Sequence, residues 1–155
     1  MPLHENEIRL PRSGHTPSSG LFKLALEEGL IEKLGLVAKK RAFRQGEQVI
    51  SAGARSTCVH ILDHGSAEVL IPDDDGEVRS IREIAPGEML GLTESLAGTA
   101  WVFSVRSMND SVFLEIPRNE FVTFLRNEPN ICFELSSLMA AAFIECFRAA
   151  ADRPN

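Results

Sequence analysis

The middle of the chain, from about Phe43 to Ile116, consists of short runs in which apolar and polar residues alternate. A period of two is typical of strands that bury one face, and clusters of Gly, Pro and Asp between the runs mark turns. Asp63-His64-Gly65 and Asp73-Asp74-Asp75-Gly76 each separate two such runs, which predicts a β-hairpin at both places. The predicted strands comprise residues 48–50, 58–62, 67–71, 77–84, 101–106 and 112–116. So many short antiparallel strands indicate a sandwich or a roll.

Both ends of the chain change to a helical period. Apolar residues recur along two stripes between residues 21 and 34, where Gly29 and Gly35 favour an interrupted helix. Pro129 suits the first turn of a longer helix, which we expect from Asn130 to about Ala151. The pattern therefore predicts a mainly β protein with flanking helices.

Two further segments complete the expected organisation. Residues 1–19 carry several Pro, Gly and polar residues without periodicity, which is typical of a flexible arm. The basic run Lys39-Lys40-Arg41-x-x-Arg44 is expected at the solvated end of a helix, because Lys and Arg favour helix C-termini. We predict an arm over residues 1–19 and a single domain over residues 20–155, a size that is ordinary for one domain.

A series of motifs that contain Gly follows the predicted strands. They are Phe43-x-x-Gly46-Glu47-x-Val49-x-x-x-Gly53, Val59-His60-Ile61-Leu62-x-x-Gly65-x-x-Glu68-Val69, Pro86-Gly87-Glu88-x-x-Gly91 and Ile116-Pro117-x-x-x-Phe121. In this order and spacing they resemble the cyclic-nucleotide-binding domain family, seen in catabolite-activator-type regulators and in regulatory subunits of cyclic-nucleotide-dependent kinases. The resemblance covers roughly residues 21–150. It implies a double-stranded β-helix, or jelly roll (β-roll), with a long C-terminal helix.

The resemblance ends at the residues that anchor a nucleotide in that family. There a Gly-Glu pair, a helical turn and an Arg form a cassette, in which the Glu binds the ribose hydroxyl and the Arg binds the cyclic phosphate. Gly91 matches the Gly, whereas Leu92 stands at the Glu position and Trp101 at the Arg position. Cys146 and Phe147 fall at the places on the long helix that would face the purine. The candidate pocket is therefore Gly91, Leu92, Thr93, Trp101, Val102, Cys146 and Phe147.

Loss of both anchors predicts that cAMP and cGMP do not bind at micromolar concentrations. Two or three charge-assisted hydrogen bonds of about 1.5–3 kcal/mol each are worth several powers of ten in affinity. Arg106 is expected on the opposite face of its strand from Trp101, while Arg82 on an earlier strand is a possible substitute cation. Two interpretations of this apolar pocket are open: it is adapted to bind an apolar ligand, or it is filled by the side chains of the protein itself.

The long C-terminal helix carries two apolar stripes. The stripe that we expect to face the β-roll of the same chain consists of Ile131, Leu135, Leu138 and Ala142. The other stripe consists of Met139, Phe143, Cys146 and Ala150, at spacings typical of a seam between two paired helices. In bacterial members of the family that the chain resembles, this helix forms the dimer interface. We therefore predict a homodimer through the second stripe.

Charge and composition limit the other functions. A net charge of −6 argues against a surface built to neutralise nucleic-acid phosphates, and no helix-turn-helix follows the long helix before Asn155, so no direct DNA binding is expected. The scattered residues Cys58, Cys132 and Cys146 predict reduced thiols and a cytoplasmic location. Neither a secretion signal nor an apolar run near the roughly 18 residues needed to cross a bilayer is evident, so no membrane contact is expected.

Other candidate chemistry finds little support. His60-x-x-x-His64 lacks the His-x-His pattern of a cupin metal site, and we interpret both as surface histidines beside a turn. The acidic turn at residues 73–76 lacks the spacing of a calcium loop. We predict no metal, no cofactor and no catalytic residue, and a regulatory interaction module with a protein partner. The alternative is a sensor that binds a cyclic nucleotide or another small effector in a non-standard way and signals to a partner protein.

Overall fold

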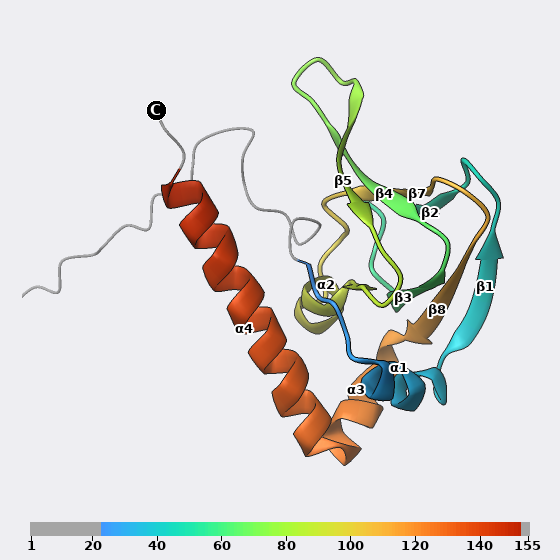
Figure 1. Cartoon of the computed structure of the whole chain (residues 1–155), viewed down its shortest axis with the longest axis vertical. Coiled ribbons are helices and arrows are strands. Elements are labelled where there is room, and N and C mark those ends of the chain that lie inside the picture. Colours follow the sequence, from blue (N-terminus) through green and yellow to red (C-terminus); the bar gives the residue numbers. More distant parts are fainter. Residues whose placement is uncertain (1–22, 153–155) are drawn as a thin grey trace, which may run out of the picture.

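The computed structural model describes residues 23–152, so the predicted arm at residues 1–19 lies outside the described part of the chain. Two antiparallel four-stranded sheets form a β-roll (Figure 1). One sheet has the order β1 (Lys39–Phe43), β8 (Ser111–Pro117), β3 (Cys58–His64) and β6 (Met89–Leu90). The other has the order β2 (Gln48–Ile50), β7 (Ser104–Ser107), β4 (Ala67–Pro72) and β5 (Val78–Ile84). The predicted mainly β fold with flanking helices is confirmed.

Four helices accompany the sheets in the described residues. They are α1 (Glu28–Gly35), α2 (Leu92–Ala97), α3 (Arg118–Asn127) and α4 (Pro129–Ala151). The prediction that Pro129 opens the long helix is confirmed, since α4 begins at that residue. The first helix is shorter than predicted because Leu24 and Leu26 are extended and exchange backbone hydrogen bonds with Met89 and Gly87.

The buried side chains form two clusters, one on each face of the β1–β8–β3–β6 sheet. The roll core lies between the two sheets and comprises Phe43, Ile50, Leu62, Ala67, Val69, Ile84, Leu90, Trp101, Phe103, Val105 and Phe113. The helix core joins the outer face of the first sheet to the helices and includes Val59, Ile61, Leu114, Ile116, Leu34, Leu92, Phe121, Ile131 and Leu135. Leu138 and Ala142 pack against the helix core, as predicted for the first stripe of α4.

The basic run and the strand boundaries differ from the prediction. Lys39-Lys40-Arg41 does not end a helix but forms most of β1, because the chain turns at Leu36 and then pairs with β8. The turn at Gly65 has the expected positive φ of 94°, yet β3 and β4 belong to different sheets, so this connection is not a hairpin. β7 begins at Ser104 rather than Trp101, since the backbone of Trp101 is bonded to Gly53 and Ala54.

α4 forms a longer apolar stretch than the one expected in the sequence analysis. The stretch Pro129–Ala149 has a mean hydropathy of 1.4, and 11% of an 18-residue window within it is buried, so by length and composition it is able to cross a membrane. The expectation that no run approaches this length is therefore wrong. A helix that pairs with another protein needs the same long apolar surface, and this finding alone does not assign α4 to a bilayer.

Candidate functional site

Trp101 lies inside the roll, directly against the backbone of Gly91. A Cβ atom on Gly91 would collide with Cη2 of the Trp101 indole, and Gly91 has a φ of 91°, so only Gly fits at this position. The indole is 5% exposed and makes edge contacts with Phe103 and His60, at centroid distances of 5.5 and 5.9 Å. The position at which the family cassette carries its Arg therefore holds an indole packed as part of the roll core.

The backbone on either side holds Trp101 in place. Its N–H donates to the Ala54 carbonyl at 2.9 Å, and its carbonyl accepts from the Gly53 N–H at 2.7 Å. Gly53 belongs to the first family-like motif, so this turn and the cassette are joined by two hydrogen bonds. The indole is thus fixed by its backbone as well as by its ring contacts.

The other predicted pocket residues lie in different surroundings. Leu92 is buried in the helix core rather than in the roll core, and Thr93 is half-buried at the start of α2. Val102 points outward and is 55% exposed. Neither Cys146 nor Phe147 belongs to the core cluster that contains Trp101, and Phe147 is 42% exposed. Of the seven candidates, the structure brings Gly91 and Trp101 into direct contact.

Arg82 forms an ion pair with the buried side chain of Glu88. Its Nη1 atom lies 2.8 Å from Oε1 of Glu88 and also donates to the Glu83 carbonyl at 3.0 Å. Oε2 of Glu88, which is 2% exposed, accepts from the Ala85 N–H at 2.6 Å. Glu88 therefore closes the Pro-Gly turn before β6, and Arg82 balances its charge. Arg106 is on the outer face, where its guanidinium pairs with Glu68 at 2.5 Å.

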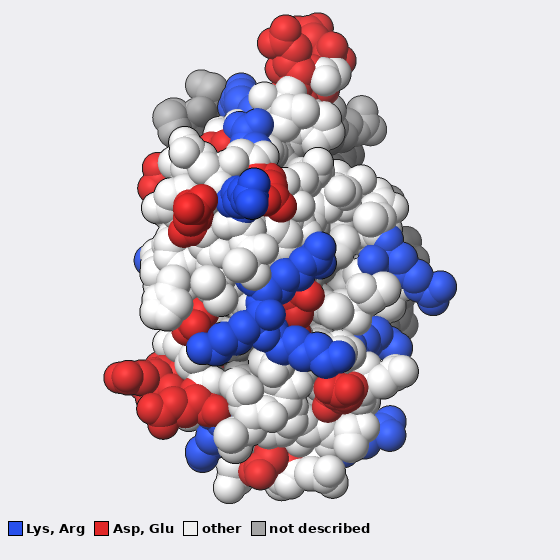
Figure 2. All heavy atoms as spheres, turned by 90° about the vertical axis from the view of Figure 1, so that its right-hand side faces the viewer, with Lys and Arg blue, Asp and Glu red and all other residues white. Residues whose placement is uncertain are grey.

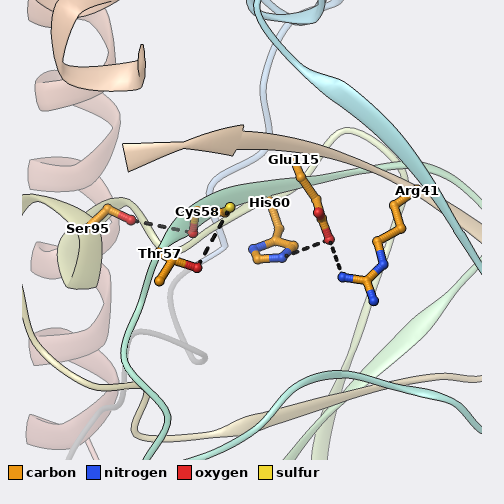
Figure 3. A network of polar contacts seen from close by, with 6 residues as sticks. All are labelled: Arg41, Thr57, Cys58, His60, Ser95 and Glu115. Atoms are coloured by element: carbon orange, nitrogen blue, oxygen red, sulfur yellow. Dashed lines mark hydrogen bonds and ion pairs between the residues drawn. The ribbon is translucent and has the colours of Figure 1, made fainter. Parts of the chain in front are cut away.

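A polar network that the sequence did not reveal extends from His60 across the first sheet (Figure 3). His60 and Glu115 are directly opposite on β3 and β8, with Nε2 and Oε1 3.4 Å apart, and Arg41 approaches the same oxygen at 3.6 Å. The hydrogen bond from His60, followed by the charges of His60 and Arg41, lowers the pKa of the Glu115 carboxyl despite its partial burial. Nδ1 of His60 is buried without a hydrogen-bond partner in the described part of the chain.

The histidines therefore differ from the prediction. His64 is exposed beside the turn, as expected, but His60 is 7% exposed and lies against Trp101 and Phe113. A strict period of two along β3 places His60 on the same face as Leu62, and this signal was available in the sequence. Among the described residues, no group of three or more His, Cys, Asp or Glu is placed to hold a metal ion.

Glu94, three residues beyond Gly91, is a buried acid whose hydrogen bonds only partly offset the loss of solvation on burial. It is 4% exposed, and the Thr93 hydroxyl donates to its Oε2 atom at 3.0 Å. Burial raises the pKa of the Glu94 carboxyl, and the hydrogen bonds from its own backbone N–H and from Thr93 only partly oppose this rise. The ionised form is therefore disfavoured in the folded chain relative to the unfolded chain.

Replacing Glu94 with Gln is expected to stabilise the fold at pH 7 by on the order of 1 kcal/mol, the typical cost of a poorly compensated buried polar group. The pKa of Glu94 is higher in the folded chain than in the unfolded chain. Its ionised carboxylate therefore lowers the free energy of unfolding fully at pH values above the folded-state pKa, and this loss vanishes at pH values below the unfolded-state pKa of about 4.3. Urea unfolding at pH 7 and pH 4 measures the difference. Glu120→Gln, at an exposed position, is the control; a gain that is equal at both pH values contradicts the burial argument.

The comparisons with known proteins agree with this fold. The sequence model of the cyclic nucleotide-binding domain matches residues 40–128, more than half of the chain. The chain is 27% identical over 94 residues to mouse patatin-like phospholipase domain-containing protein 7, a match that covers 61% of this chain but 7% of that protein.

Solved structures of low sequence identity share the fold. The catabolite activator protein of Thermus thermophilus superposes with a TM-score of 0.73 at 18% identity, over 81% of this chain and 59% of that one. The regulatory subunit of a cAMP-independent protein kinase A from Trypanosoma brucei superposes with a TM-score of 0.58 at 24% identity, over 73% of this chain and 42% of that one. The family match and the β-roll lead to the same conclusion: the chain belongs to the cyclic nucleotide-binding domain family.

Proposed function

We propose that this chain is a non-catalytic regulatory domain whose nucleotide cassette is filled by Trp101, and that it acts by contacting other proteins in the cytoplasm. The observation that carries this proposal is the indole of Trp101, seated on Gly91 in the roll core. Within residues 23–152, the two cations weighed as substitutes for the Arg are already paired, Arg82 with Glu88 and Arg106 with Glu68, which supports the proposal. The regulatory subunit that shares this fold belongs to a protein kinase A described as cAMP-independent, which supports a family member that works without this ligand.

A thermal-shift screen over cyclic mononucleotides, cyclic dinucleotides and small apolar metabolites tests the filled cassette. A ligand at 100 times its dissociation constant adds about 2.7 kcal/mol to the stability of the folded state. We expect none of these compounds to raise the melting temperature. A reproducible shift with an apolar metabolite would instead support a retuned pocket.

One observation favours a second candidate, a sensor of a small effector. Nδ1 of His60 is a buried polar atom without a partner among the described residues, beside the Trp101 ring. Since Nε2 faces the Glu115 carboxylate, Nδ1 is the ring nitrogen left for a small polar partner. The same screen separates the candidates, because a shift that is lost in His60→Phe would identify a ligand bound at this atom.

The proposed module includes a homodimer through α4. Phe143 and Ile144 are 50% and 51% exposed, and the Phe143 and Phe147 rings lie 4.7 Å apart on the face turned away from the helix core. Met139 packs partly on the helix core, and the side chain of Ala150 lies outside the described residues. Exposed rings in contact along one helix form an apolar surface of the kind that partners cover. The three charged residues of α4, Glu134, Glu145 and Arg148, favour a protein partner over a bilayer core.

Sedimentation at micromolar concentration tests the dimer. We expect a species of twice the 17.1 kDa chain mass, and Phe143→Glu is expected to convert it to the monomer because two carboxylates would be buried in the seam. Leu36→Glu, an equally polar change at an exposed position outside α4, should leave the dimer intact. A monomer at every concentration, or a dimer that tolerates Phe143→Glu, contradicts the seam.

A further inference from the structure

β1 is an edge strand with almost no buried surface. It pairs with β8 over five residues on one side and is the last strand of its sheet. Lys39, Lys40, Arg41 and Ala42 are exposed, and Phe43 alone is buried. The strand is therefore held by its ladder with β8 rather than by packing. Its outer edge presents backbone N–H and C=O groups to which another strand can bind.

Cations gather along this edge. Lys39, Lys40 and Arg41 lie in β1, and Arg44 follows it at an exposed position. Figure 2 shows Lys and Arg side chains clustered in the middle of the face that contains β1, whereas the acidic β4–β5 turn projects away from it. The pairings of this cluster are long, at 3.7 Å from Lys40 to Asp63 and 3.6 Å from Arg41 to Glu115. In a chain of net charge −6, this edge is a local positive surface.

A shallow groove continues the edge at the C-terminal end of β1. It has a volume of about 330 Å³ and is lined by Ala42, Phe43, Arg44, Glu47, Asp110, Ser111 and Val112. Its two carboxylates already accept hydrogen bonds, Glu47 from the Arg44 N–H at 3.1 Å and Asp110 from the Gln45 N–H at 3.2 Å. Ala42, Phe43 and Val112 form the apolar part of the lining, beside Arg44 and Ser111. The groove therefore suits one apolar side chain next to a segment that faces the cations.

We propose that the β1 edge binds a short, extended, acidic segment of a partner protein as an additional strand of the first sheet. Alternate acidic side chains would face Lys39 and Arg41 on one face of the strand, a further acid would face Arg44, and an apolar residue at that end would enter the groove. Main-chain hydrogen bonds supply affinity in this binding mode, and the side chains supply selectivity. Each cross-strand pair of opposite charge contributes about 0.2–1 kcal/mol, so the affinity depends on salt and several acids are needed.

The geometry favours a peptide over other anions. The cations follow a single strand of five residues beside free backbone groups, which match an extended chain and not a flat lipid surface. A duplex nucleic acid would bring many phosphates against the remaining acidic surface of a chain with net charge −6. The edge strand is β1, which does not include Trp101, so a test of this inference is independent of a test of the filled cassette.

The test uses a fluorescent peptide, Leu-Glu-Thr-Glu-Thr-Glu-Leu, whose binding to the full chain is followed by anisotropy at low salt. We expect saturable binding that weakens at least tenfold in K39E/R44E. Neither of these side chains makes an ion pair among the described residues, so the fold should tolerate the change. The matched control K33E/R79E reverses two exposed cations elsewhere, one of them on the edge strand β5 of the other sheet, and should change the affinity less than twofold.

Two further probes distinguish a bound strand from simple charge attraction. Alternate N–H groups of an extended peptide point to opposite edges, so two peptides are made, each with N-methyl groups along one edge. The peptide methylated on the edge that pairs with β1 should bind at least tenfold more weakly, and the other should still bind. The Gln peptide of the same pattern should not bind. The proposal is overturned by no saturable binding, by equal losses in K39E/R44E and K33E/R79E, or by equal binding of both N-methylated peptides. Binding to phosphatidylserine vesicles without binding to the peptide also overturns it.

Discussion

Replacing Trp101 with Ala is expected to lower the free energy of unfolding by about 3–5 kcal/mol, the usual cost of removing a large buried aromatic ring. The indole packs on Gly91 and meets Phe103 and His60 edge-on, so its removal leaves a cavity whose walls are held by two sheets. Because small domains are stable by about 5–15 kcal/mol, this loss is a large part of the total. Urea unfolding measures it directly.

Two controls connect this loss to the filled cassette. Val102→Ala, at the adjacent exposed position, should change stability by less than about 0.5 kcal/mol. Added indole should partly restore the stability of Trp101→Ala and not that of the unmodified chain, because a dry apolar cavity binds a ligand of matching shape. If Trp101→Ala lowers the free energy of unfolding only slightly and added indole has no effect, Trp101 does not fill the roll core.

Replacing Arg82 with Met is expected to be nearly as costly, at about 3–5 kcal/mol, because the change leaves the carboxylate of Glu88 buried without its cation. The remaining donor, the Ala85 N–H, satisfies one oxygen only. The double variant Arg82→Met/Glu88→Gln should recover most of the loss, since it leaves no buried charge without a partner.

Urea unfolding of the two single variants and the double variant gives the coupling between Arg82 and Glu88. Arg79→Met, at an exposed position on the same strand, serves as the control and should change stability by less than about 0.5 kcal/mol. If the losses of Arg82→Met and Glu88→Gln simply add in the double variant, the two side chains do not act as a pair.

Alternation and turn residues predicted a mainly β sandwich or roll, and the order of the family-like motifs narrowed this prediction to a β-roll. Pro129 and the two stripes of α4 likewise predicted where the helix begins and which stripe packs on its own chain. The errors lie where tertiary pairing decides. Lys39-Lys40-Arg41 has no apolar alternation, and it forms a strand because β8 offers it a ladder. A local pattern also does not reveal that β3 and β4 pair in different sheets.

The candidate site was predictable only in part, for a similar reason. Counting along the cassette identified Leu92 and Trp101 as the unusual positions, but not where their side chains point. Leu92 faces the helix core while Trp101 faces the roll core, although both stand at positions that bind nucleotide in the family. The His60–Glu115 contact depends on the register of β3 against β8, which the sequence of one chain does not specify.

Titration calorimetry with cAMP and cGMP tests the central claim, that Trp101 occupies the place of a nucleotide, most directly. Each nucleotide is titrated into the chain to about 1 mM, alongside a family member that retains the Glu and Arg of the cassette. The filled cassette predicts no saturable heat for this chain with either nucleotide, because the two anchors are absent and an indole lies on Gly91. A dissociation constant of about 10 μM or below for either nucleotide would contradict the account.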